Sequence, residues 1–131
     1  MPRFALLEHR WNGVHWDFML ERPETGTLRT WAIDAPIEPE RELPARALAD
    51  HRLDYLDYEG EVSGGRGSVR RVDRGEYTTV EWEKDRVVVR VEGVQLVGLV
   101  GLTAVRNVGK SGESVPRGLN WAFRFNSGNF D

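Results

Sequence analysis

The chain has 131 residues, 30% of them charged, with a formal net charge of -3 and no cysteine. This length predicts one domain, residues 1–131, with room for a hydrophobic core. The near-balanced charge gives no sign of a polyanion-binding tail, and the lack of cysteine excludes disulfides and cysteine-based zinc sites. No apolar run approaches the roughly 20 residues of a membrane span or forms a signal peptide, so a soluble, cytoplasmic protein is expected.

The first two predicted strands cover residues 4–9 and 14–21. From Val14 to Glu21, apolar residues alternate with a set that begins with His15, Asp17 and Met19. Alternation with a period of two predicts a half-buried strand, in which His15 and Asp17 point the same way.

The loop between these strands decides where His9 lies. A two-residue loop at Asn12 and Gly13 would place His9 on the opposite face from His15. A three-residue loop, Trp11 to Gly13, pairs His9 with His15 and needs a positive φ at its last residue, which glycine accepts. On this register His9, His15 and Asp17 form a two-histidine, one-carboxylate cluster suited to Mn, Fe or Zn. The alternative is an ordinary hairpin with incidental surface histidines.

The middle of the chain is less regular. A turn at 22–26 precedes a third predicted strand over 27–33. Residues 34–44 contain three prolines, which argues against a regular element there, and residues 44–50 predict one or two helical turns. The glycine-rich segment 63–68 predicts a flexible connector and lacks the Gly-Lys-Ser/Thr ending of a P-loop.

The C-terminal half predicts further short strands, over residues 68–72, 76–82, 86–91, 94–106 and 119–125. A turn is predicted at 73–75, and residues 107–118 are polar and glycine-rich. About eight short strands with one or two helical turns predict a mainly β fold, a small antiparallel β-barrel. The five tryptophans are expected in the core and the barrel wall.

The run from His9 to Glu21 resembles the motif His-x5-His-Tyr/Trp-Asp-Leu-Arg-Leu-Glu of the 3′-phosphoesterase domain of bacterial DNA ligase D. Three further blocks resemble the same family in the same order. They are residues 28–33 (Leu-Arg-Thr-Trp-Ala-Ile), residues 50–60 (beginning Asp-His and ending Tyr-Glu-Gly) and residues 63–75. The four blocks together cover roughly residues 4 to 82 and are far more specific than the first motif alone.

This resemblance implies a small β-barrel that removes 3′-phosphates or 3′-terminal ribonucleosides from DNA ends during DNA repair by non-homologous end joining. It implies Mn²⁺ as cofactor, with Zn²⁺ or Co²⁺ as alternatives. The residues that it implies are His9, His15 and Asp17 as metal ligands, His51 at the scissile phosphate, Arg29 in place of a phosphate-facing lysine, and Tyr55 closing the pocket.

The sequence departs from the family at three positions. Met19 replaces an arginine, Ala49 stands where a glutamate is usual, and Leu43 stands where an arginine is usual. An arginine that contacts phosphate through a charge-assisted hydrogen bond contributes strongly to binding in a dry site, so Met19 puts turnover in doubt. A catalytically weak or inactive metal-binding barrel that holds nucleic-acid ends is therefore a second interpretation.

Other arginines are candidates for the missing cations. Arg46 and Arg52 are expected to substitute at the phosphate, and Arg66 is a third candidate for substrate binding. Four arginines between residues 66 and 74 form a basic stretch that could follow a phosphate backbone, or could be a solvated hairpin beside Asp73 and Glu76. The expected partners are DNA or RNA/DNA 3′ ends and separate ligase or polymerase proteins, with the chain itself a monomer.

Overall fold

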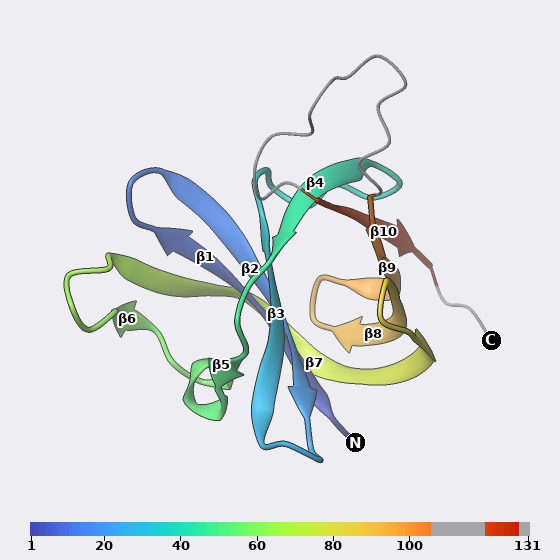
Figure 1. Ribbon diagram of the computed structural model, residues 1–131, viewed down its shortest axis with the longest axis horizontal. Helices are drawn as coiled ribbons and strands as arrows, with labels where there is room; N and C mark the ends of the chain where they lie inside the picture. The colour runs from blue at the N-terminus through green and yellow to red at the C-terminus, as the bar shows by residue number, and fades with distance from the viewer. Residues whose placement is uncertain (106–119, 129–131) are drawn as a thin grey trace.

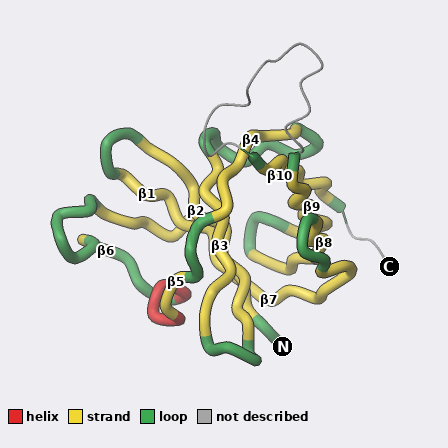
Figure 2. The backbone as a smooth tube through the Cα atoms, viewed as in Figure 1, coloured by secondary structure: helices red, strands yellow, loops and turns green. Residues whose placement is uncertain are grey.

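The computed structural model describes residues 1–105 and 120–128. Its strands are β1 (Arg3–Arg10), β2 (Val14–Arg22), β3 (Thr27–Ile33), β4 (Glu42–Ala47), β5 (His51–Arg52), β6 (Gly60–Glu61), β7 (Ser68–Trp82), β8 (Arg86–Gly93), β9 (Val97–Ala104) and β10 (Trp121–Ser127). One short 3-10 turn, η1 (Leu53–Leu56), follows β5 and is red in Figure 2. Within these ranges no helix has the length and apolar character needed to cross a bilayer.

Eight of the strands close into an antiparallel barrel. The order around the ring is β1, β2, β3, β4, β10, β9, β8 and β7, and β7 pairs back with β1 (Figure 1). The two-residue strands β5 and β6 lie outside this ring, β5 against β3 and β6 against β7. The predicted barrel of about eight strands is therefore confirmed.

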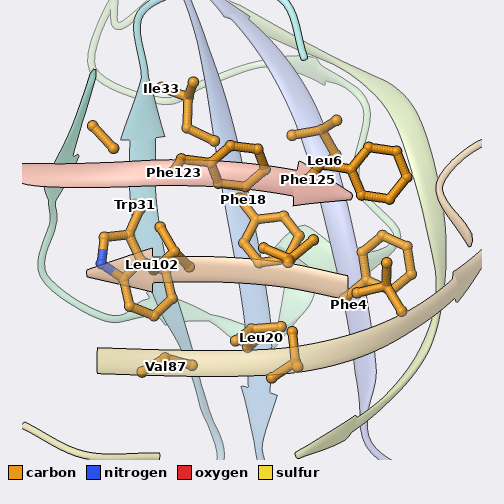
Figure 3. Packing of buried hydrophobic residues seen from close by; sticks show 14 of the residues in the cluster. Phe4, Leu6, Phe18, Leu20, Trp31, Ile33, Val87, Leu102, Phe123 and Phe125 are labelled. Carbon is orange, nitrogen blue, oxygen red and sulfur yellow. The ribbon is translucent and has the colours of Figure 1, made fainter. Parts of the chain in front are cut away.

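β1 and β2 bury side chains on both of their faces. The inward face joins the barrel core, where side chains from opposite strands meet (Figure 3); its fully buried members include Phe4, Leu6, Phe18, Leu20, Trp31 and Phe123. The outward face carries a second apolar cluster, made of Ala5, Leu7, Met19, Leu28, Leu56, Val62 and Val69. Because Leu56 and Val62 belong to this cluster, the segment 53–62 covers the outward face of the hairpin.

The β1–β2 hairpin has the predicted register. His9 pairs with His15 and Arg10 with Val14, so the loop is the three residues Trp11 to Gly13. Gly13 has the expected positive φ, +111°, and Asn12 before it also has a positive φ of +53°. Asparagine is one of the few other residues that enter this region at low cost, so the Asn-Gly pair fits the turn.

The prediction of helical turns over residues 44–50 is wrong, because β4 runs through this segment. Leu43 and Ala45 face the barrel core, while Pro44 and Arg46 alternate with them. β4 pairs with β3 on one side and β10 on the other, and these pairings override the helix propensity of its alanines and leucine.

The predicted turn at residues 73–75 is also wrong, because β7 continues through it for 15 residues. A bulge accommodates one extra residue there, since Leu6 pairs with Asp73 and Leu7 with Arg71. Gly75 serves close strand packing, because a Cβ at this position would lie 2.0 Å from the Glu92 carbonyl oxygen.

Two other strands start later than predicted. β9 begins at Val97, where a strand from residue 94 was expected, and β10 begins at Trp121, where one from residue 119 was expected. Residues 94–96 instead form the turn that binds Asp73. The polar segment predicted over residues 107–118 lies outside the described residues.

Asp73 holds the β8–β9 turn and supplies a test of the fold. It is 4% exposed, and its carboxylate accepts hydrogen bonds from the main-chain N–H groups of Val94, Gln95 and Leu96 at 2.7–3.0 Å. Replacing it with alanine leaves these donors unpaired, so Asp73→Ala should lower the free energy of unfolding by about 3 kcal/mol in urea denaturation. Asp85→Ala, at an exposed turn, is the control. Loss of less than about 0.5 kcal/mol in Asp73→Ala, the usual range for surface changes, would contradict this role.

Candidate metal centre

His9, His15 and Asp17 converge on the outward face of the β1–β2 hairpin. His9 Nδ1 lies 3.2 Å from His15 Nε2 and 3.5 Å from Asp17 Oδ2, and His15 Nε2 lies 3.0 Å from Asp17 Oδ1. The hairpin register brings the imidazoles opposite one another, and the strand period brings the carboxylate to the same face. The predicted cluster is present as a geometric unit.

The spacing of these three residues fits a single divalent ion. Ligand atoms bonded to one ion at about 2.1 Å lie about 3.0 Å apart at right angles and about 3.4 Å apart at the tetrahedral angle. The observed separations of 3.0–3.5 Å cover this range. Asp17 Oδ1 is also buried, with His15 Nε2 as its close polar neighbour, as expected of a carboxylate oxygen placed to share a cation with that imidazole. These residues could therefore hold a metal ion and leave further coordination positions open.

A main-chain carbonyl fixes the orientation of His9. His9 Nε2 donates a hydrogen bond to the Arg66 carbonyl oxygen at 2.8 Å, which leaves Nδ1 of the neutral ring free to act as a ligand atom. Gly67, the next residue, has a φ of +77°, and a Cβ there would lie 1.8 Å from the Arg10 carbonyl oxygen. Glycine thus allows the loop to approach β1 closely enough to bind His9.

The cluster shifts the pKa values of its own members. Hydrogen bonding to Asp17 raises the pKa of His9 above its ordinary value, against the opposing effect of burial. Burial acts to raise the pKa of Asp17, but the neighbouring His15 and His9 imidazoles outweigh it and hold the pKa below the ordinary value. Without a metal, the contacts within the cluster therefore stabilise the charged forms of His9 and Asp17.

The cluster borders a cavity of about 580 Å³, the metal-site cavity, which His51 also lines. Its remaining lining residues are His9, Trp11, Asp17, Leu48, Ala49, Asp50, Arg52, Tyr55, Val62, Ser63, Arg66 and Val69. His51 Nδ1 donates to the Ala49 carbonyl oxygen at 3.0 Å, so the main chain orients this ring although Ala49 replaces the glutamate that is usual in the family. Tyr55 stacks edge-on against His51, with ring centroids 5.7 Å apart.

The three predicted substrate-binding arginines lie in different places. Arg52 and Arg66 line the metal-site cavity, and the Arg66 side chain donates from Nε to the Ser63 carbonyl oxygen at 2.9 Å. Arg46 is outside the cavity lining but on the same sheet face as Asp17, because Ala32 pairs with both residues. Its guanidinium reaches Asp34 at 3.6 Å, and its Nε is buried without a hydrogen-bond partner among the described residues.

The structure does not bring Arg29 to the cluster, which corrects the expectation that it supplies a second cation there. Arg29 pairs with Leu20 and lies two residues before Trp31 on the same strand, so Arg29 and Trp31 point to the same face. This face is opposite to the one that carries Asp17. Its guanidinium carbon lies 4.4 Å from the centre of the Trp31 ring and 5.7 Å from that of Trp121. Burial lowers the pKa of Arg29, which fits this position over aromatic rings.

Met19 and Leu43, two of the departures from the family pattern, are both fully buried. Met19 follows Asp17 on the outward face but packs into the second apolar cluster, at 0% exposure. Leu43 is 1% exposed and faces the barrel core. Neither environment would accept an arginine without a new ionic partner.

The arginines between residues 66 and 74 are mostly neutralised by carboxylates. Three of them form ion pairs: Arg70 with Glu8 at 2.9 Å, Arg71 with Glu59 at 3.7 Å, and Arg74 with Asp57 at 3.1 Å. This favours the alternative of a solvated hairpin over a continuous phosphate-binding track. The partners are not the expected Asp73 and Glu76, because the ion pairs cross between strands and loops.

Two contributors to the site were missed in the sequence. Trp11 was expected in the core, but it is 45% exposed, lines the metal-site cavity and stacks beside His9 at 6.3 Å between ring centroids. Its position at the tip of a three-residue loop was the available signal. The Arg66 carbonyl could not be foreseen, because its contact with His9 joins residues 57 positions apart.

The chain is similar to known proteins over most of its length. The profile of the DNA Ligase D 3′-phosphoesterase domain matches residues 7–103. The chain is 32% identical over 106 residues to the multifunctional non-homologous end joining protein LigD of Pseudomonas aeruginosa, covering 73% of this chain and 12% of that relative. It is 30% identical over 108 residues to the LigD protein of Mycobacterium bovis, covering 76% of this chain and 14% of that relative.

The chain thus spans less than a fifth of the length of these relatives. The range matched by the family profile, residues 7–103, contains the three candidate metal ligands together with His51 and Tyr55. The chain belongs to the DNA ligase D 3′-phosphoesterase domain family.

Proposed function

We propose that this chain is a Mn²⁺-dependent phosphoesterase that removes a 3′-phosphate or a 3′-terminal ribonucleoside from DNA ends. The observation that carries the proposal is the convergence of His9, His15 and Asp17 beside a cavity that His51 also lines. Membership of the family and similarity to non-homologous end joining proteins support a role in processing DNA ends.

In this proposal His9, His15 and Asp17 hold the metal, and Zn²⁺ or Co²⁺ could take its place. A bound divalent ion would neutralise charge on a phosphate oxygen and lower the pKa of a coordinated water. The protein keeps the ligand atoms oriented, with the Arg66 carbonyl fixing His9. This orientation matters because a phosphoester is cleaved when its charge is neutralised and its attacking group is aligned.

His51 is the proposed acid at the leaving oxygen. The Ala49 carbonyl binds Nδ1–H, so the protonated ring presents Nε2–H for donation to a phosphate or leaving oxygen. Tyr55 packs against the ring and restricts its rotation. Arg52 and Arg66, which line the same cavity, supply positive charge for the substrate phosphate.

Arg46 is the proposed replacement for the family arginine whose position Leu43 occupies in this chain. It lies two strands from Asp17 on the same face, and the residue between them is Ala32, which is too small to block a long side chain. Its Nε lacks a hydrogen-bond partner among the described residues, so it can donate to a phosphate oxygen. Arg29, on the other face, is not part of this proposal.

One observation favours a second function, in which the barrel binds nucleic-acid ends without efficient cleavage. Met19 occupies the position of a family arginine and sits in an apolar cluster, so the outward face lacks a cation at that point. Metal-dependent binding of a 3′-phosphate end without phosphate release would favour this second function. In either case the proposed partners are separate ligase or polymerase proteins, and the proposed state is a monomer.

Substitution of a metal ligand should separate metal binding from turnover. His15→Ala removes one of three ligands, so it should weaken Mn²⁺ binding at least about ten-fold and abolish phosphate release from a 3′-phosphate oligonucleotide. His51→Ala is the matched control, since it should keep Mn²⁺ affinity and lose release. Calorimetric titration with Mn²⁺ and a phosphate-release assay measure both. Unchanged Mn²⁺ binding in His15→Ala would refute the assignment of the cluster.

The pH dependence of stability should reverse when metal is added. The raised pKa of His9 means that its contribution in the metal-free protein is complete below its ordinary value of about 6.5 and is lost as pH rises through the raised value. The Asp17 contribution runs the other way, because its pKa is lowered: it is lost as pH falls through that lowered value. The free energy of unfolding of the metal-free wild type, minus that of metal-free His9→Gln, should therefore fall as pH rises from about 5.5 to about 8.

The stabilisation of the protein by Mn²⁺ should increase with pH, because metal ligands must be deprotonated to bind the ion. The increase in Tm on adding Mn²⁺ should grow over the same pH range, as measured by thermal unfolding. A Mn²⁺-induced increase that is independent of pH, or equal in His9→Gln, would count against binding at this cluster.

The glycine-rich segment 63–68 should control metal affinity through its contact with His9. Gly67→Ala would place a Cβ 1.8 Å from the Arg10 carbonyl oxygen, pushing the Arg66 carbonyl away from His9, and should weaken Mn²⁺ binding by about ten-fold or more. Gly65→Ala is a close control, because Gly65 has a similar φ of +68° but open space around its Cβ position. Equal Mn²⁺ affinity for the two variants in calorimetric titration would show that the loop does not position His9.

A further inference from the structure

A second and larger cavity, of about 810 Å³, lies beside the metal-site cavity. The two share Arg52, Tyr55, Val62 and Ser63 in their walls. We name the larger one the tyrosine cavity; its other lining residues are Asp54, Tyr58, Glu61, Gly64, Gly65, Gly67 and Ser68. None of these additional side chains has a part in the proposed phosphoester chemistry. The four shared residues make the two cavities direct neighbours, which places the tyrosine cavity next to a phosphate bound at the metal centre.

Three neighbouring aromatic rings lie along the boundary between the two cavities. Tyr55 lies between His51 and Tyr58, with ring centroids 5.7 Å and 5.8 Å from theirs, and meets both edge-on. Tyr58 is 38% exposed, and its hydroxyl donates a hydrogen bond to the Glu61 carbonyl oxygen, which fixes the ring. An exposed ring held in one orientation is a suitable surface for stacking a planar base.

The charges of the tyrosine cavity argue against a phosphate as its occupant. Asp54 and Glu61 contribute two carboxylates, against the single guanidinium of Arg52. Carboxylates repel a phosphate but accept hydrogen bonds from ribose hydroxyls and from base amino groups. The volume lies within the range of small-molecule sites, about 300–1,000 Å³. The cavity therefore fits the uncharged part of a nucleotide.

We propose that the tyrosine cavity binds the nucleoside attached to the phosphate at the metal centre, with Tyr58 as the stacking surface for its base. This inference rests on the proposed function for the position of the phosphate, but it concerns a different cavity and a different part of the substrate. Tyr58 is a specificity determinant in this view, because it touches the base and not the reacting atoms.

Steady-state kinetics with paired substrates test the proposal. One DNA strand ends in a 3′-terminal adenosine, and the other ends in an abasic ribose at the same position. Tyr58→Ala should raise KM for the adenosine end by about ten-fold, the effect of losing one base–aromatic contact, with kcat nearly unchanged. For the abasic end, Tyr58→Ala and wild type should have similar KM values, since base and ring act as one interacting pair. Tyr58→Phe keeps the ring but loses the hydroxyl hydrogen bond that fixes it, so its KM for the adenosine end should lie between the wild-type and Tyr58→Ala values.

A binding measurement keeps this test separate from the proposed function. Fluorescence anisotropy of the same strands, labelled at their 5′ ends and mixed with metal-free protein in EDTA, reports affinity without turnover. If wild type cleaves neither strand, the proposed function fails, and anisotropy still decides whether the base contributes to binding through Tyr58.

The inference itself is overturned if wild type binds adenosine and abasic ends equally, a comparison that needs no variant to fold. It is also overturned if Tyr58→Ala weakens the binding of the adenosine end and of the abasic end by the same factor. Val80→Ala, at a 56% exposed position outside both cavities, is the surface control and should leave every value unchanged.

Discussion

The pairing of His9 with His15 across the β1–β2 hairpin is the constraint on which the candidate site depends. Side chains alternate between the two faces of a strand, so a shift of one residue would turn His9 away from its companions. The three-residue loop fixes this register, and its Asn-Gly ending accepts the two positive φ values that the loop requires. Turn chemistry therefore sets the register of the cluster, and the long-range contact with the Arg66 carbonyl then orients the His9 ring.

The second requirement is that β1 and β2 are covered on both faces. The barrel core packs against the inward face, and the segment 53–62 covers part of the outward face through the second apolar cluster. Residues of this covering segment and of the glycine-rich segment 63–68 line both the metal-site cavity and the tyrosine cavity. The strands thus carry the candidate ligands and the loops supply most of the cavity lining, an arrangement that suits a binding site.

Much of this could be predicted from local sequence patterns. The alternation in β2 and the length of the hairpin loop were sufficient to place His9, His15 and Asp17 together. The count of about eight strands was also right, although it divided β7 at the turn predicted over residues 73–75 and omitted β4. β4 was missed because Pro44 and its neighbouring alanines favour a helical start, whereas pairing with β3 and β10 decides the outcome. Arg29 was misplaced because motif similarity identifies a position in a chain and does not say which face the side chain occupies.

The distances in sequence between the parts of the site bear on how the molecule assembles. The three candidate ligands lie within nine residues and meet once a hairpin forms, an event that takes about 1–10 μs in isolated hairpins. Barrel closure instead requires β1 to pair with β7, whose first residue lies 65 positions after the first residue of β1, and such non-local pairings slow folding. If the proposed metal site is correct, a cation bound by the nascent hairpin would hold its strand register before the barrel closes.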